Sequence, residues 1–150
     1  GRNYGWGEPR KLDPEGRTPL CGSCKSRLAN LHDGVVEVSG AALANLLKAS
    51  PLPVIVDCWA VWCGPCKAFA PTFSKLARER FGQVVFAKMN TDDNQPAAQA
   101  HSIRGIPTMI VFHRGAEIGR QTGALPEHAF REMVDEIIEE TLKGAAASTA

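Results

Sequence analysis

The apolar positions fall into blocks that predict strands and helices in alternation. Short, nearly continuous apolar runs are typical of strands buried on both faces, whereas apolar residues three and four positions apart indicate helices with one buried side. The clearest strand is PVIVDCWA at 53–60. The pattern predicts strands at 35–38, 53–60, 84–90, 108–113 and 116–121, with helices at 41–49, 63–80 and 94–100 and a last helix starting at Pro126.

This order predicts an α/β fold with a mixed central sheet flanked by helices. Strands separated by helices are joined by right-handed parallel crossovers. Only Arg114 and Gly115 separate the last two strands, so we expect a hairpin that adds antiparallel strands at one side of the sheet.

The two ends of the chain differ from this central block. Residues 1–34 contain few large apolar side chains, so this segment needs a metal or a docking surface to become ordered. Residues 144–150 read GAAASTA and predict a frayed, flexible tail. We therefore divide the chain into an N-terminal segment at 1–34, a folded domain at 35–143 and a tail at 144–150.

Composition and charge narrow the functional classes. With 17 Lys plus Arg against 16 Asp plus Glu, the chain lacks the basic excess of a general nucleic-acid binder. No apolar run reaches the length of a membrane span, and the opening GRNYGWGEPRK has no apolar signal core, so we expect no membrane partner and a cytoplasmic location. Five cysteines do not suit a fully paired extracellular scaffold.

The motif WCGPCK at 62–67 carries the strongest chemical signal. It follows a predicted buried strand and opens a predicted helix. Two intervening residues let the sulfurs of Cys63 and Cys66 meet, and the helix N-terminus stabilises a thiolate on the first. We expect Cys63 to attack a substrate disulfide and Cys66 to resolve the mixed disulfide. Gly64 admits a partner chain, Pro65 stiffens the loop, and Trp62 offers a flat apolar contact.

A structural disulfide or half of a metal site is the alternative interpretation of the motif. A Cys-x-x-Cys pair alone would leave these alternatives open, but the buried strand, Trp, Gly-Pro and helix start together favour redox chemistry. Three other functions compete with a disulfide reductase. The first is a disulfide oxidase or isomerase on the same fold, and the second is a docking module whose thiols are incidental. The third is a zinc-dependent regulatory or chaperone role for residues 1–34.

Two further residues are ambiguous from the pattern alone. Asp57 interrupts an apolar strand, and it is either a buried acid with a raised pKa, able to accept the proton of Cys66, or a surface-facing residue. Pro107, in RGIPT at 104–108, precedes a strand, where a cis bond would expose backbone groups to an extended substrate. Only about 5–6% of X–Pro bonds are cis, so the residues alone favour a trans turn.

Residues 35–143 closely resemble thioredoxin. The resemblance rests on VDCWAVWCGPCK at 56–67, Pro71, KMNTDDN at 88–94, RGIPT, the Arg114-Gly115 hairpin and Gly123. It implies a thioredoxin fold, with Pro107 in cis, Asp57 as a buried acid and Lys88 as its neighbour. It further implies a thioredoxin-type protein-disulfide reductase with an apolar docking face made by Trp62, Gly64, Ile106 and Gly123.

The same resemblance implies partners and cofactors. Electrons would come from NADPH through a separate thioredoxin reductase, and the substrates would be proteins with disulfides. The exchange itself would require no cofactor, and we expect a monomer. The sequence departs from the family at Cys58, where an aromatic residue is common, and at Val61, where an acid is common. We read Cys58 as a small core residue that faces away from Asp57.

A second pair, CGSC at 21–24, resembles half of a zinc ribbon. Tetrahedral zinc needs four ligands, and only Cys21 and Cys24 are present here. The arrangement is similar to bacterial thioredoxins with an N-terminal zinc ribbon, so we expect a first pair upstream of Gly1. His32 as a third ligand, free thiols, or a Cys21–Cys24 disulfide are the alternatives.

Overall fold

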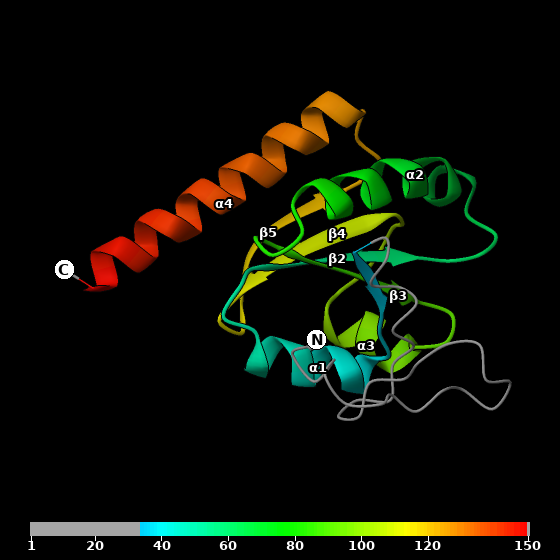
Figure 1. The fold of residues 1–150 in the computed structure, drawn as a ribbon. Coiled ribbons are helices and arrows are strands. Elements are labelled where there is room, and N and C mark those ends of the chain that lie inside the picture. The colour runs from blue at the N-terminus through cyan, green and yellow to red at the C-terminus, as the bar shows by residue number, and fades with distance from the viewer. Residues whose placement is uncertain (1–33, 150) are drawn as a thin grey trace, which may run out of the picture.

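One mixed sheet organises the described part of the chain, which in this computed structural model is residues 34–149. The five strands lie in the order β1-β3-β2-β4-β5 (Figure 1). The strands are β1 (Val35–Glu37), β2 (Val54–Trp59), β3 (Val85–Asn90), β4 (Thr108–His113) and β5 (Ala116–Thr122), and the helices are α1 (Gly40–Ala49), α2 (Gly64–Glu79), α3 (Gln95–Ala100) and α4 (Glu127–Thr149).

The strand directions confirm the predicted mixed sheet. Strands β1, β3 and β2 are parallel, β4 is antiparallel to β2, and β5 is antiparallel to β4. Arg114 and Gly115 turn the β4–β5 hairpin with φ of 53° and 84°. Positive φ at both central residues matches the right-handed twist of the strands they join, which is why this two-residue hairpin forms.

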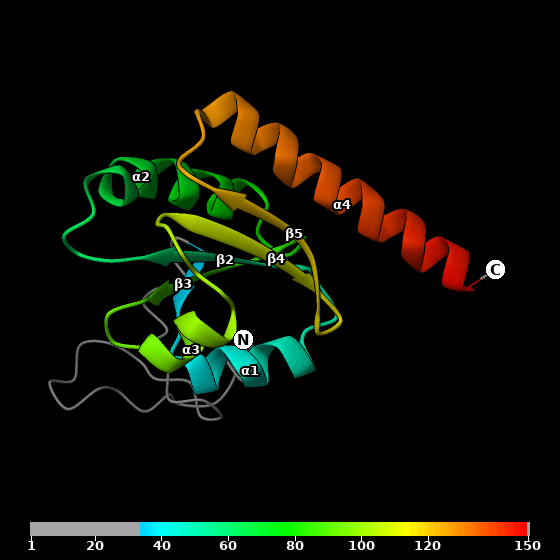
Figure 2. The same cartoon turned by 180° about the vertical axis from the view of Figure 1, so that it is seen from behind.

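Helices cover both faces of the sheet. Helices α2 and α4 lie on one face and α1 and α3 on the other (Figures 1 and 2). The α2/α4 face is filled by an aromatic cluster of Phe69, Phe73, Phe86 and Phe130, with ring centroids 5.0 to 6.4 Å apart. Phe73 is fully buried at its centre, and truncating such a side chain to alanine costs about 3–5 kcal/mol.

The ends of the domain show one departure from the sequence prediction. Helix α4 continues through Gly144 to Thr149, whereas we predicted a frayed tail there. Alanine has the highest helix propensity, and the three consecutive alanines at 145–147 explain why the backbone continues as a helix. Residues 1–33 of the predicted N-terminal segment, which include Cys21, Cys24 and His32, lie outside the described residues. No helix of the described region has the length and apolar character needed to cross a membrane.

Candidate active site

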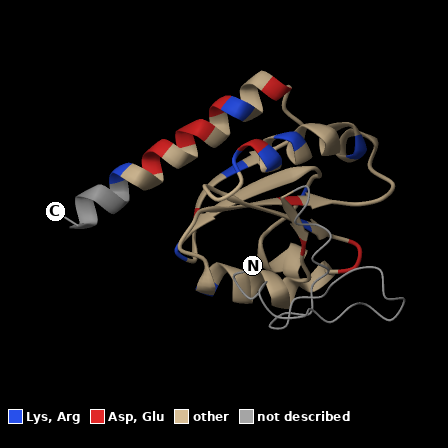
Figure 3. Cartoon of the chain, viewed as in Figure 1, with Lys and Arg blue, Asp and Glu red and all other residues tan. Residues whose placement is uncertain are grey.

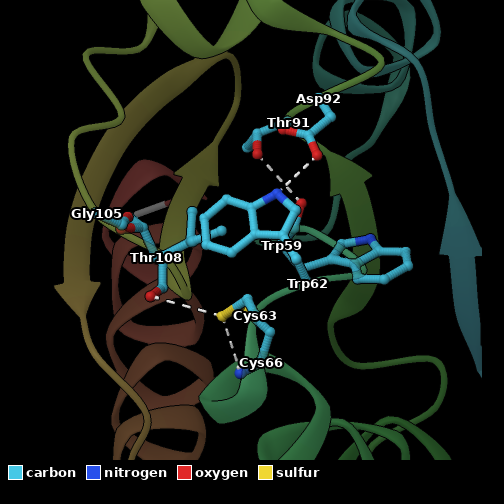
Figure 4. Close-up of a disulfide and its surroundings, with 9 residues drawn as sticks. Trp59, Trp62, Cys63, Cys66, Thr91, Asp92, Gly105 and Thr108 are labelled. Atoms are coloured by element: carbon cyan, nitrogen blue, oxygen red, sulfur yellow. Dashed lines mark hydrogen bonds between the residues drawn. A yellow bond between two sulfur atoms is a disulfide. The ribbon is translucent and has the colours of Figure 1, made fainter.

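Cys63 and Cys66 lie where strand β2 leads into helix α2. The central strand ends at Trp59, and α2 begins at Gly64. A disulfide joins Cys63 and Cys66, whose Cα atoms are 5.2 Å apart (Figure 4). Both side chains are almost fully buried, whereas Gly64 and Pro65 between them are exposed. The predicted pair therefore forms a disulfide that substrates can approach from the loop side.

The N-terminus of α2 supplies the electrostatics of the site. Cys63 is the N-cap of this helix, and its Sγ accepts a hydrogen bond from the backbone N–H of Cys66 at 3.2 Å. An unpaired N–H and the positive end of the helix dipole both favour negative charge at this position. Reduction of the disulfide thus leaves Cys63 where a thiolate is stabilised.

A second loop faces Cys63 from the start of β4. The Ile106–Pro107 peptide bond is cis, as the family resemblance implied and the residues alone did not. The carbonyl oxygen of Ile106 lies 3.8 Å from Cys63 Sγ. The N–H of Gly123 donates to the Pro107 carbonyl at 2.8 Å, which ties the end of β5 to the same loop. Ile106, Pro107 and Gly123 are thereby brought to the Cys63 side of the site.

Two exposed apolar side chains form the rim beside the disulfide. Trp62 is 67% exposed and Val61 is 58% exposed. The Trp62 Nε1 donates a hydrogen bond of 2.8 Å to Asp92 Oδ2, on the loop after β3 (Figure 4). This bond fixes the orientation of an indole whose burial is too small to hold it in place.

Asp57 is the buried acid that the resemblance implied. It is completely buried, and its two carboxylate oxygens have no hydrogen-bond partner within the described residues. Desolvation raises the pKa of Asp57 from 3.8 to about 6, and the positive charge of Lys88 on β3 partly opposes that rise. Lys88 is the register partner of Asp57, and its Nζ lies 4.6 Å from the centre of the Trp59 ring.

The position of Asp57 along β2 points it towards α2. Side chains two residues apart on a strand share a face, and Ile55 packs in the cluster that contains Phe69 and Phe73 of α2. Cys66 is buried on the same side of α2, three residues before Phe69. Asp57 and Cys66 therefore belong to the same layer between the sheet and α2.

Cys58 has a different environment although it adjoins Asp57. It is fully buried among apolar residues on the α1/α3 face, including Leu43, Met89 and Ile110. Burial raises the pKa of Cys58 to about 12, and the nearby Asp57 charge adds to the rise. The prediction of a small core residue facing away from Asp57 is confirmed.

Sequence reasoning missed the residues that support the rim. Asp92 lies inside the motif KMNTDDN, and its hydrogen bond to Trp62 joins positions 30 residues apart. Thr91 Oγ1 donates to the Trp59 carbonyl at 3.3 Å, which links the same loop to the end of β2. The available signal was the exposed Asp92-Asp93 pair, which begins two positions after the end of β3. In residues 34–149, no group of three or more His, Cys, Asp or Glu side chains is arranged to hold a metal ion.

Comparisons with known proteins agree with this geometry. The family model described as Thioredoxin matches residues 34–136. Thioredoxin C-3 of Corynebacterium nephridii is 35% identical over 122 residues, covering 81% of this chain and 82% of that protein. The chloroplastic Thioredoxin M-type of Zea mays is 36% identical and covers 77% of this chain and 68% of that protein. The solved structure of a mutant thioredoxin from Halobacterium salinarum NRC-1 superimposes with a TM-score of 0.64 at 29% identity, covering 71% of this chain and 92% of that one.

Proposed function

Because the chain belongs to the thioredoxin family, we propose that its exchange runs towards reduction of protein disulfides, with Cys63 attacking and Cys66 resolving. The chain is a thiol–disulfide oxidoreductase, and dithiol–disulfide exchange in this family needs no cofactor. The observation that carries the assignment of roles is the position of Cys63 as N-cap of α2 with its sulfur accepting the Cys66 N–H.

The proposed reaction has two exchange steps. The Cys63 thiolate attacks one sulfur of the substrate disulfide, forms a mixed disulfide and releases the other substrate sulfur as a thiolate, which takes a proton from water. The Cys66 thiolate then attacks Cys63 Sγ, closes the Cys63–Cys66 disulfide and releases the second substrate thiolate. Two electrons pass from the protein dithiol to the substrate.

Asp57 is our candidate for the proton acceptor in the second step. Cys66 must lose a proton before it attacks, and a buried carboxylate with a pKa of about 6 is ionised near neutral pH. Its two unpartnered oxygens leave it free to accept that proton. Lys88 acts on this step through Asp57, because its positive charge favours the ionised carboxylate.

The substrate chain docks, in this proposal, on the apolar rim beside Cys63. Trp62 and Val61 offer exposed apolar area, and Gly64 and Gly123 have no heavy atom within 4 Å of an added Cβ, which leaves room for a partner backbone. Pro65 is exposed next to Gly64, and Ile106 presents its carbonyl beside the sulfur. Val61, where the family commonly has an acid, favours substrates with an apolar residue near their disulfide.

Further proposals concern the partners and the compartment. We assign an NADPH-dependent thioredoxin reductase as electron donor, disulfide-containing proteins as substrates and the monomer as the working form, because family membership supports this arrangement. A cytoplasmic location is also a proposal, since the relatives include a chloroplastic protein.

The reduction potential of the Cys63–Cys66 couple tests the direction of electron flow. We expect a value of about −270 mV, which is the potential of thioredoxin itself. Equilibration of the protein in defined thiol buffers, read by intact mass, gives the potential. A value near about −120 mV, typical of a strong oxidant, would show that the protein forms disulfides instead.

A structural zinc in the N-terminal segment is a separate proposal. It rests on the CGSC spacing of Cys21 and Cys24, which supplies two of the four ligands of a structural site. Zinc analysis of protein purified from metal-replete medium tests it, with a Cys21→Ser, Cys24→Ser variant as control. An equal zinc content in the two proteins would show that Cys21 and Cys24 are not zinc ligands.

A further inference from the structure

A groove of about 530 Å³ lies between the edge strand β5 and helix α4. It is separate from the disulfide, because it borders the far half of β4 at Val111 and His113, whereas Cys63 faces the loop before β4 begins. Its apolar lining includes Val111, Ile118, Met133 and Ile137. Ile118 is 51% exposed, so the groove presents apolar surface directly to solvent.

Strand β5 leaves one backbone edge available beside this groove. Within residues 34–149 it pairs only with β4, and every one of its seven residues is exposed or half-exposed. The pairing of β5 with β4 is regular from Gly119 to Thr122 and shifts at Ile118, and the opposite edge strand, β1, has three residues. Unpaired N–H and C=O groups on a long edge strand can pair with an added strand. Gly119 keeps the groove open, because the nearest atom to an added Cβ is Val111 Cβ at 3.9 Å.

The helix wall of the groove is acidic. From 127 to 143, α4 carries six acids, Glu127, Glu132, Asp135, Glu136, Glu139 and Glu140, against two bases, Arg131 and Lys143 (Figure 3). Glu136 and Glu140 line the groove one helical turn apart. Neither forms an ion pair with a Lys or Arg in the described residues, whereas Asp135 pairs with Arg80 and Glu139 with Lys143.

The negative charge of α4 favours a positively charged binding partner in the groove. Two copies of this protein joined through their β5 edges would bring two acidic helices together, and like charges oppose such a contact. Positively charged side chains would instead meet the unpaired carboxylates of Glu136 and Glu140. Because alternate residues of a strand point to opposite faces, the aliphatic stems of the same Lys or Arg side chains would pack on Met133 and Ile137.

We propose that this groove binds an extended segment of a partner protein, with alternating apolar and Lys or Arg residues, as a strand added to β5. The backbone of the segment would pair with the β5 edge, and its basic side chains would face α4. The surface works independently of the disulfide, so the proposal does not depend on the direction of electron flow.

A synthetic peptide of alternating lysine and valine, with capped ends, is the probe. We expect it to shift the backbone amide resonances of β5 and the 133–141 stretch of the full-length oxidised protein, with weaker binding at higher salt. A peptide of alternating glutamate and valine should leave these resonances unchanged. Shifts confined to the Trp62 side of the molecule, or no shifts at all, would overturn the proposal.

Two variants test the groove in different ways. Gly119→Val fills it without strain, since the position has no positive φ and the nearest contact is an ordinary one, so we expect binding to weaken at least about tenfold. Glu136→Lys with Glu140→Lys should weaken binding by a similar factor and reduce its salt dependence. Glu37→Lys on β1 makes the same type of charge change at the other sheet edge and should leave affinity unchanged.

Activity and circular dichroism check that each variant is folded. All three should reduce disulfides at the rate of the unchanged protein, because none of these residues belongs to the active site. Unchanged peptide affinity in both groove variants would contradict the proposal. So would peptide-independent self-association through β5, or contacts of the chain's own residues 1–33 with Met133 in nuclear Overhauser spectra.

Discussion

The two faces of strand β2 give two adjacent ionisable residues different environments and different pKa values. Asp57 faces the layer between the sheet and α2, and its pKa is raised only to about 6, so it can change protonation near neutral pH. Cys58 faces α1 and α3, and its pKa of about 12 keeps it a neutral thiol. Both are buried, so burial alone does not create reactivity. What distinguishes the active face is the N-terminus of α2 and the charge of Lys88.

The contrast extends to the cysteines. Cys63 and Cys58 are both almost inaccessible by fractional exposure. Cys63 nevertheless caps a helix and lies beside the Ile106 carbonyl, with exposed Gly64 and Pro65 next to it. Cys58 is packed among apolar side chains of the α1/α3 face. Placement at a helix N-terminus with a loop open to solvent makes a buried sulfur reactive.

The largest expected effect is the difference in activity between a variant without the Cys63 sulfur and a variant without the Cys58 sulfur. Cys63→Ser is expected to reduce catalysed insulin reduction by dithiothreitol to the uncatalysed rate, because a serine hydroxyl does not attack disulfides near neutral pH. Cys58→Ala should retain nearly full activity. Comparable losses of activity in the two variants would contradict the inference that only the α2 side of β2 carries a reactive thiol.

Removing the acid should change how stability depends on pH. Because the pKa of Asp57 is raised from 3.8 to about 6, the folded state binds more protons than the unfolded state in this window. The contribution of the Asp57 carboxyl to the free energy of unfolding is therefore present at low pH and is lost as the pH rises through about 6. The shift corresponds to about 3 kcal/mol. At pH 4 the unfolded carboxyl, with its pKa of 3.8, is already partly ionised, so Asp57→Ala should be more favourable to stability at pH 8 than at pH 4 by about 2 kcal/mol.

Urea denaturation of the oxidised protein at both pH values measures this difference without titration of Cys63 or Cys66. An equal effect of the substitution at pH 4 and pH 8 would contradict the raised pKa. Lys88→Met serves as the matched control, and it should move the pKa of Asp57 further upward, because the opposing positive charge is removed. Carbon-13 spectra of the labelled carboxyl report that pKa directly.

A polar atom at Cys58, on the α1/α3 face of the sheet, should lower the free energy of unfolding and leave catalysis unchanged. Cys58→Ser places a hydroxyl among apolar side chains, where an unpartnered group costs about 1–3 kcal/mol. Cys58→Ala separates this cost from the loss of volume. Chemical denaturation should show the serine variant to be the less stable of the two, with unchanged activity in both. A serine variant as stable as the alanine variant would mean that the serine hydroxyl finds a hydrogen-bond partner on the α1/α3 face.

The smallest expected effect concerns the rim. Asp92→Ala removes the partner of the Trp62 indole N–H, and an exposed hydrogen bond of this kind is worth about 1 kcal/mol. We expect KM for a protein disulfide substrate to rise roughly two- to fivefold with kcat unchanged. Asp93→Ala, at the neighbouring exposed acid, is the control. An equal rise in KM for Asp93→Ala would show that charge, and not indole orientation, sets the effect.

The sequence predicted what depends on local pattern. The apolar run of β2, the Arg114-Gly115 turn and the Cys63–Cys66 motif each lie within a few residues, and all were placed correctly. The environment of Asp57 depends on packing against α2, so the strand pattern alone could not decide it. The Trp62–Asp92 bond joins two loops and has no local signature. The cis bond at Pro107 followed only from the family resemblance, because the residues themselves favour trans.

Trapping the mixed disulfide tests the central assignment most directly. A Cys66→Ser variant cannot complete the second exchange, so a disulfide substrate should remain attached to it. Proteolysis and mass spectrometry then locate the attachment. We expect it on Cys63 alone, with Cys58 unmodified. Attachment at Cys58, or an equally stable adduct on Cys66 in the matching Cys63→Ser variant, would contradict the assignment of Cys63 as the attacking thiol.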